Sequence, residues 1–127
     1  MLKMNSKERD PRTHAIIGAA MEVHKEMGPG FLEAVYHECL EIEFNLRKIE
    51  YVSKPQLNIF YKENQLKKYY IPDFLVFDEI IVEIKAERCL TKEDEAQIIS
   101  SLKSSKKKVG LLINFGELSL KFKRFVY

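Results

Sequence analysis

Three charged residues interrupt an apolar stretch in the second half of the chain. The sequence from Tyr69 to Ala86 reads YYIPDFLVFDEIIVEIKA, and Asp73, Glu83 and Lys85 lie within its apolar runs. A buried carboxylate without compensation is costly, so such groups are normally paired, protonated or bound to a metal. The pattern therefore favours a cation held by Asp73 and Glu83, with Lys85 beside it.

These residue types suit phosphodiester hydrolysis. Side chains alternate faces along a strand, so Glu83 and Lys85 share one face. Two carboxylates supply the oxygen ligands that Mg²⁺ or Mn²⁺ prefers and leave positions for water and phosphate oxygens. Lysine adds a compact positive charge that steadies a phosphate or orients the attacking water, which a bound metal activates. If residues 80–86 formed an edge strand, Glu83 and Lys85 would instead pair with surface groups, and Asp73 would be a turn or salt-bridge residue.

The proposed site places a condition on the turn between two strands. Directly opposed residues of an antiparallel pair point to the same face. A two-residue turn would oppose Asp73 to Ile84 and put the aspartate on the wrong side of the sheet from Glu83. We therefore predict a three-residue connection or a bulge between Phe74 and Val82.

Apolar periodicity predicts an α/β fold with a mixed sheet. We expect helices over residues 11–27, 31–48 and 91–105, and strands over 51–53, 56–61, 67–77, 80–86, 108–115 and 118–126. The strands from 51 to 86 would form a meander, with a turn at 62–64. Both faces of the strands at 67–77 and 80–86 are largely apolar, so the sheet should be covered on both sides.

Apolar residues at intervals of three and four predict the buried faces of the helices. In the first helix they are Ile16, Ile17, Ala20, Val23 and Met27. In the second they are Phe31, Val35, Cys39, Ile42 and Leu46. The third helix should begin at Thr91, with Asp94 completing a capping box, and its buried residues should be Ala96, Ile99 and Leu102.

Length and composition indicate one ordinary domain. With 127 residues, 46% of them hydrophobic, we expect a flexible lead-in over residues 1–11 and a single domain over 12–127. Apolar runs stay well short of the roughly 20 residues that span a bilayer, so we expect a cytoplasmic protein without membrane contact. The spacing of Cys39 and Cys89 matches neither a zinc site nor a disulfide framework. The histidines are expected on the surface or in packing, and they are His14, His24 and His37.

Positive charge is concentrated near the C-terminus. The formal net charge is +2, but residues 100–127 contain seven Lys or Arg and one Glu. This asymmetry favours an anionic partner such as a phosphate backbone, although a solvated basic surface explains it equally well. The residues expected to contact nucleic acid are Lys103, Lys106, Lys107 and Lys108, and Lys121, Lys123 and Arg124 belong to the same basic set.

Two motifs together resemble the GxxExxY proteins, a branch of the PD-(D/E)xK nuclease superfamily. The first is GFLEAVY at residues 30–36, and the second is Pro72-Asp73 followed by Glu83-Ile84-Lys85. Gln97 and the strand VGLLINFG at 109–116 match as well, so that the resemblance covers nearly the whole chain. It implies a restriction-endonuclease-like core, with a central mixed β-sheet flanked by helices on both faces.

The resemblance also implies a role for each site residue. Asp73 and Glu83 would bind Mg²⁺ or Mn²⁺, and Lys85 would assist the attacking water. Glu33 would complete the acidic cluster, unless it is simply an exposed carboxylate near a helix N-terminus. Gln97 would line the pocket, unless it is an ordinary polar position on its helix. Tyr36 would brace the helix and support the pocket.

The function expected from these features is metal-dependent hydrolysis of DNA or RNA. The alternative is a catalytically silent nucleic-acid-binding or regulatory domain that retains the nuclease fold. Cleavage of both strands of a duplex would favour a homodimer.

Overall fold

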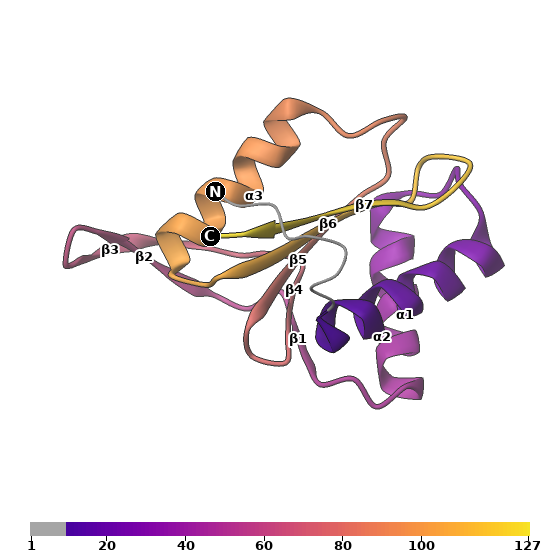
Figure 1. Ribbon diagram of the computed structural model, residues 1–127, viewed down its shortest axis with the longest axis horizontal. Helices are drawn as coiled ribbons and strands as arrows, with labels where there is room; N and C mark the ends of the chain where they lie inside the picture. The colour runs from indigo at the N-terminus through magenta and orange to yellow at the C-terminus, as the bar shows by residue number, and fades with distance from the viewer. Residues whose placement is uncertain (1–9) are drawn as a thin grey trace.

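The computed structural model describes residues 10–127, which form three helices and seven strands. In chain order they are α1 (Pro11–Met27), α2 (Glu33–Leu46), β1 (Tyr51–Ser53), β2 (Leu57–Tyr61), β3 (Asn64–Tyr70), β4 (Phe74–Val76), β5 (Ile80–Lys85), α3 (Lys92–Ser105), β6 (Val109–Asn114) and β7 (Lys121–Val126) (Figure 1). Of the expected lead-in, residues 1–9 lie outside the described part. Asp10 caps α1 by accepting a hydrogen bond from the Arg12 N–H, and Pro11 opens the helix, where its missing N–H costs nothing.

A five-stranded mixed sheet forms the centre of the molecule, as expected. Its strand order is β1-β4-β5-β6-β7, with β5 and β6 parallel and the other neighbours antiparallel. One face packs against α1 and α2, and the other packs against α3 and the separate two-stranded sheet of β2 and β3 (Figure 1). This architecture is consistent with a restriction-endonuclease-like fold, and covering on both faces explains the continuous apolar runs of β4, β5 and β6.

The expected meander is wrong. The strand expected over residues 67–77 is two strands in two sheets, because β3 pairs with β2, whereas β4 pairs with β1 and β5. The residues between them include Pro72, which has no N–H to donate to a ladder, and Asp73, whose side chain bonds the opposite strand. The expected turn also shortens, since Asn64 already belongs to β3.

The buried face of α2 also differs from the expected one. Phe31, Ile42 and Leu46 are 45%, 54% and 72% exposed. The buried residues of this helix are Tyr36, His37, Leu40 and Phe44. This neighbouring stripe carries two large aromatic rings, and the polar groups of its Tyr and His find hydrogen-bond partners, so it can be buried at less cost.

The start of α3 agrees with the sequence. Thr91 and Asp94 form a reciprocal capping box with distances of 3.0 and 3.1 Å. Of the expected buried residues Leu102 is buried, but Ala96 is exposed and Ile98 takes its place in the core. The helix lies close to the sheet, because a Cβ added at Gly110 would come within 3.1 Å of the Ile98 side chain.

Parallel pairing of β5 and β6 brings their carboxyl ends to one edge of the sheet. Lys85 at the end of β5 is paired with Asn114 at the end of β6. Asn114 is fully buried and holds the segment that follows β5, accepting from the Glu87 N–H and donating to the Glu87 carbonyl at 3.0 Å each. The last strand, β7, begins at Lys121 rather than at 118, and Leu118 is 93% exposed.

Candidate active site

Asp73 and Glu83 face each other across two antiparallel strands. A three-residue connection, 77–79, joins β4 to β5, and Phe74 pairs with Val82. One step further along the same register, Asp73 falls opposite Glu83, as the parity argument required. The predicted three-residue connection is confirmed, and both carboxyl groups come from the same side of this strand pair.

Hydrogen bonds fix the two carboxylates to each other's backbone. The Asp73 N–H donates to Oε1 of Glu83 at 2.8 Å, and Oδ2 of Asp73 accepts from the Ile84 N–H at 2.8 Å. Within residues 10–127, Oδ1 of Asp73 accepts no backbone N–H, and Nδ1 of His37 lies 3.8 Å from it. Backbone hydrogen bonds therefore fix the position of both carboxylates.

Tyr70, which the sequence reasoning missed, is the second hydrogen-bond donor to the Glu83 carboxylate. Its hydroxyl at the end of β3 donates a short hydrogen bond to Oε2 of Glu83. Burial, followed by the negative charge of Glu83, raises the pKa of Tyr70, so this hydroxyl stays protonated and acts as a donor. No sequence signal pointed to this contact, because it depends on the docking of the β2–β3 sheet beside the central one.

Burial raises the pKa of Glu83 to about 7, and the neighbouring negative charge of Asp73 adds to the rise. The hydrogen bond from Tyr70 works in the opposite direction, since it stabilises the charged form. The carboxyl groups of Asp73 and Glu83 are thus close together and partly buried, and the positive charge near them does not balance their negative charge. Perturbed carboxyl groups of this kind are common at functional sites.

Lys85 lies on the same strand face as Glu83 and is directed by α3. Its Nζ lies 3.9 Å from Oδ1 of Asp94, which is in the first turn of this helix and is the partner of Thr91 in the capping box. Burial acts to raise the pKa of Asp94, but the N–H of Thr91 and further hydrogen bonds lower it overall, so Asp94 is a stable anion beside Lys85. Sequence reasoning gave Asp94 only its part in the capping box, and an acidic residue in the first turn of a helix, nine positions after the lysine of ExK, is a signal that could have been used.

Glu33 lies in the first turn of α2 and keeps its solvent contact. Partial loss of water around its carboxylate, followed by the negative charge of Asp73, raises its pKa, whereas the charge of Lys85 lowers it. Glu33 is therefore electrostatically coupled to the pair at Asp73 and Glu83. No group of three or more His, Cys, Asp and Glu side chains within residues 10–127 is arranged to hold a metal ion, so the expected three-carboxylate cluster is not assembled.

His37 is a further neighbour of Asp73. Its Nε2 is hydrogen-bonded to the Ser53 hydroxyl at 2.7 Å, and its ring stacks on Phe74 with centroids 4.2 Å apart. Burial lowers the pKa of His37, even though the charge of Asp73 opposes this. This histidine packs as expected, and it also forms the wall of the site on the side of α2.

Tyr36 and Gln97 occupy different surroundings. Tyr36 is fully buried and ties down the segment before α2, because its hydroxyl donates to the Gly28 carbonyl and accepts from the Phe31 N–H at 3.2 Å. Its bracing role is thus structural. The side chain of Gln97 is exposed, one turn after Asp94 on α3, and no contact joins it to the carboxylates among the described residues.

The basic residues expected to contact nucleic acid lie away from the carboxylates. Lys103 is exposed on α3. Lys106, Lys107 and Lys108 follow the end of that helix and line a pocket with Val109, the first residue of β6. This is the edge of the sheet opposite to Lys85.

The donor set fits a divalent cation in its chemistry. Asp73 and Glu83 supply hard oxygen ligands. Burial, followed by the charge of Asp73, raises the pKa of Glu83, and a bound cation would counter both effects. Since both oxygens of Glu83 already accept hydrogen bonds, a metal would have to share Glu83 with Tyr70 or displace the hydroxyl.

Comparisons with known proteins agree with this chemistry. A family model described as the PD-(D/E)XK nuclease superfamily matches residues 10–125. The chain is also similar to the DNA-directed RNA polymerase subunit alpha of Desulfovibrio desulfuricans (strain ATCC 27774 / DSM 6949 / MB), 30% identical over 76% of this chain, and to that of Lawsonia intracellularis (strain PHE/MN1-00), 29% identical over 76%. It spans about a quarter of the length of these relatives, 26% in each case. No solved structure shows a significant similarity.

No helix within residues 10–127 is long and apolar enough to cross a membrane.

Proposed function

The chain belongs to the PD-(D/E)XK nuclease superfamily, and on that basis we propose that it is a divalent-metal-dependent nuclease that hydrolyses phosphodiester bonds of DNA or RNA. The observation that carries this proposal is the opposition of Asp73 and Glu83, hydrogen-bonded to each other's strand, on the face that also carries Lys85. These are the residues of the PD and ExK motifs.

Asp73 and Glu83 would hold Mg²⁺ or Mn²⁺, with Glu33 as a third carboxylate. A bound divalent cation lowers the pKa of a water ligand and offsets charge on the phosphate. The charge coupling of Glu33 to Asp73 supports the place of Glu33 in this set. The requirement for metal follows from charge, since two carboxylates alone would repel a phosphate.

Lys85 would orient the attacking water or bind a non-bridging oxygen of the scissile phosphate. The Asp94 carboxylate lies 3.9 Å from this ammonium group on the side of α3 and restricts its position. Because a fixed donor needs no reorganisation when charge develops on the phosphate, this arrangement favours the transition state. Asp94 would act as a positioning residue through Lys85.

Finer assignments belong to the same proposal. The motif at residues 30–36 supports membership of the GxxExxY branch, and we place a single nuclease domain over 12–127. Gln97 would contact substrate from α3, and the proposed contacts with the phosphate backbone are Lys103, Lys106, Lys107 and Lys108. The transcription role named for the two polymerase subunits is not part of the proposal, because the aligned region is about a quarter of their length.

A catalytically silent nucleic-acid-binding domain is the second candidate. It is favoured by the state of Glu83, whose two oxygens already accept hydrogen bonds from Tyr70 and the Asp73 N–H. In addition, the described residues contain no preassembled group of three metal ligands. Such a protein would bind nucleic acid in a salt-dependent manner and leave it intact.

Cleavage assays with labelled single-stranded and double-stranded DNA and RNA separate the two candidates. The nuclease consumes at least one substrate when Mn²⁺ is supplied and none in the presence of a chelator. Asp73→Asn and Lys85→Ala should abolish cleavage while circular dichroism shows an intact fold, and Lys92→Ala, an exposed lysine outside the site, should cleave normally. Salt-dependent binding without cleavage of any substrate would establish the silent domain.

A further inference from the structure

A pocket lined mainly by basic side chains lies at the end of the sheet opposite to the candidate active site. It has a volume of about 370 Å³ and is lined by Arg12, Glu79, Lys106, Lys107, Lys108 and Val109. Glu79 and Val109 stand at the start of β5 and β6, whereas Lys85 ends β5. Since a strand rises roughly 3.3 Å per residue, β5 separates the two places by about 16 Å. The pocket reaches the size range of ligand sites, which begins at about 300 Å³.

The lysines of this pocket are positioned by neutral groups. Nζ of Lys107 donates to the Asp78 carbonyl at 3.2 Å, and Nζ of Lys106 lies 4.5 Å from the ring centroid of Phe60. Within residues 10–127, none of the three lysines forms an ion pair with a carboxylate, whereas Lys123 elsewhere on the surface does so at 2.6 Å. Their charge is therefore concentrated, and no carboxylate in the described part of the chain pairs with it.

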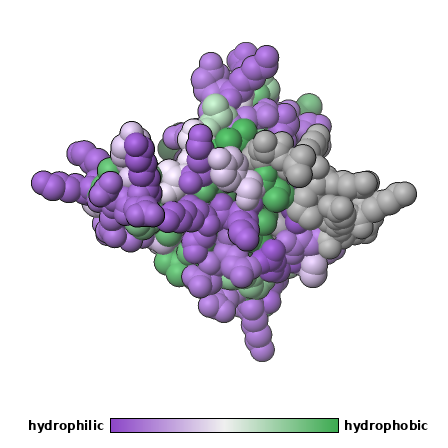
Figure 2. Space-filling model, turned by 60° about the vertical axis from the view of Figure 1, so that its left-hand side comes forward, coloured by the Kyte–Doolittle hydropathy of each residue, from purple (hydrophilic) through white to green (hydrophobic). Residues whose placement is uncertain are grey.

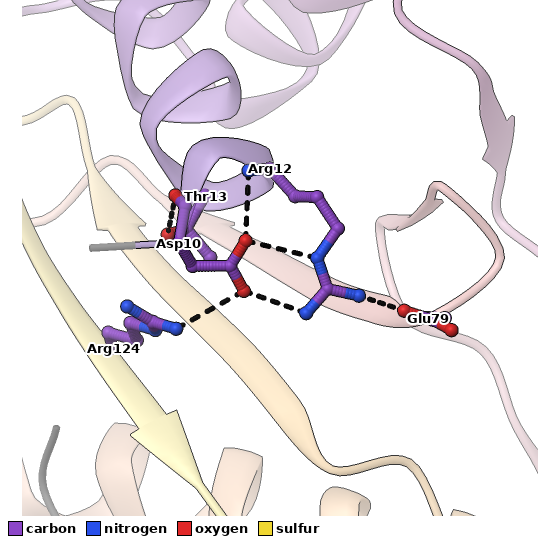
Figure 3. Close-up of polar contacts among 5 residues, drawn as sticks. All are labelled: Asp10, Arg12, Thr13, Glu79 and Arg124. Carbon is purple, nitrogen blue, oxygen red and sulfur yellow. Dashed lines mark hydrogen bonds and ion pairs between the residues drawn. The ribbon is translucent and has the colours of Figure 1, made fainter. Parts of the chain in front are cut away.

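Arg12 is held rigidly at the wall of the pocket (Figure 3). Asp10 accepts from its Nε at 3.0 Å and from its Nη2 at 2.7 Å, and Nη1 pairs with Glu79. Figure 3 shows that Arg124 approaches the same Asp10 carboxylate from the other side, at 3.2 Å. Asp10 thus orients the guanidinium, and a planar fork fixed in this way is well suited to a phosphate.

Glu79 is the one carboxylate among the lining residues, and its side chain is 64% exposed. Exposed ion pairs contribute little free energy, so a ligand with a larger negative charge can replace Glu79 at Nη1 of Arg12. The C-terminus of α3 adds a negative charge of only about half a unit near Lys106, far less than the positive charge of the three lysines. Figure 2, in which the left-hand side of Figure 1 comes forward, shows a face that is largely hydrophilic.

We propose that this pocket is a second binding site that takes the phosphate groups of an anionic ligand, held by Arg12, Lys106, Lys107 and Lys108. The chemistry is that of two or more adjacent phosphates, which a nucleic-acid backbone and a free nucleoside di- or triphosphate both offer. The proposal deepens the assignment of Lys106, Lys107 and Lys108 as phosphate contacts. Because the pocket shares no residue with the carboxylate site, phosphate binding there is separable from cleavage.

The test is calorimetric titration of the full chain with inorganic pyrophosphate at low salt, in the presence of a chelator. The double variant Lys106→Gly, Lys108→Gln removes two pocket charges. Glycine suits the left-handed conformation at Lys106, where φ is 63°, so the turn after α3 is preserved. We expect this variant to bind pyrophosphate about tenfold or more weakly, on the order of what two nearby charges contribute. Glu79→Gln should bind it more tightly than the wild type.

The matched control removes two exposed lysines outside the pocket, Lys25→Gln and Lys92→Gln. It changes the net charge equally and should keep wild-type affinity. The proposal is overturned if the wild type does not bind pyrophosphate, if the pocket variant binds it normally, or if the control loses as much affinity. Because no metal is present, these results are independent of cleavage at Asp73 and Glu83.

Competition identifies the source of the phosphates. A single-stranded oligonucleotide that displaces pyrophosphate from the wild type, and does so less well in the pocket variant, assigns the site to the nucleic-acid backbone. Pocket-dependent pyrophosphate binding that the oligonucleotide leaves unchanged, but that ATP displaces, assigns it to a free nucleotide. Both results support the phosphate site.

Discussion

Asp73 and Glu83 each bind the strand that carries the other. The Asp73 N–H donates to the Glu83 carboxylate, and the Asp73 carboxylate accepts from the Ile84 N–H, both at 2.8 Å. The site is therefore part of the pairing between two strands, so that its geometry is set by the sheet itself and not by a loop.

Metal should stabilise the protein through this pair. We expect added Mn²⁺ to raise the melting temperature of the wild type. The free energy of unfolding should increase by about 2.7 kcal/mol when free metal reaches about a hundred times its Kd. Glu83→Gln should abolish the response, and Glu38→Gln, an exposed acid on α2, should keep it. Differential scanning calorimetry measures both, and an equal rise in all three proteins would exclude specific binding at Glu83.

The metal-free protein should lose stability as the pH rises. The pKa of Glu83 is raised from 4.5 to about 7 by burial and then by Asp73, so the folded state binds more protons than the unfolded state between these values. The free energy of unfolding therefore falls across this window. Chemical denaturation at several pH values should show a flatter profile for Glu83→Gln, and an unchanged slope would contradict the assignment to this residue.

Removing the Tyr70 hydroxyl should destabilise the metal-free protein. Tyr70→Phe keeps the ring and deletes the donor to the Glu83 carboxylate, a charged hydrogen bond that contributes about 1.5–3 kcal/mol. The loss should appear above pH 7, where Glu83 is ionised, and shrink at low pH. Tyr69→Phe, on an exposed neighbour, serves as the control and should change little.

Asp94 combines a cap with a charge, and two variants separate these roles. Thr91→Ala breaks the capping box and should cost about 1 kcal/mol while it preserves the anion near Lys85. Asp94→Asn keeps a capping side chain but removes the charge, so cleavage should fall more than stability does. Equal activity in the two variants would show that Asp94 has no role through Lys85.

Gly116 should not accept any side chain. A Cβ there would lie 2.2 Å from the Glu87 carbonyl oxygen and 2.5 Å from the Glu87 nitrogen, both rigid backbone atoms. We expect Gly116→Ala to cost about 3 kcal/mol or more in urea denaturation, since the ends of β5 and β6 must separate. Gly18→Ala in α1 should be neutral or stabilising, because a Cβ there would lie 3.5 Å from the flexible Arg47 side chain.

Much of the carboxylate pair was predictable because it follows from local rules. Charges in apolar strands and the parity of opposed residues together required the three-residue connection that the structure contains. The contacts of Tyr70 were not predictable, since they depend on how a separate two-stranded sheet docks against the central one. A pattern along one strand carries no information about that docking.

The face of α2 was mispredicted for a related reason. Two apolar stripes lie one residue apart on this helix, and periodicity alone favours the aliphatic one with Ile42 and Leu46. The buried stripe includes Tyr36, whose hydroxyl is satisfied by the Gly28 carbonyl and the Phe31 N–H. Such partners are known only once the chain is folded.

The β2–β3 sheet adds a consequence for the timing of events at the site. Because Tyr70 reaches Glu83 from a strand that is not hydrogen-bonded into the central sheet, undocking of this small ribbon would free the Glu83 oxygen while the five-stranded sheet stays closed. Ion capture and ribbon motion would then be linked kinetically, with the rate of capture limited by a local opening and independent of global unfolding.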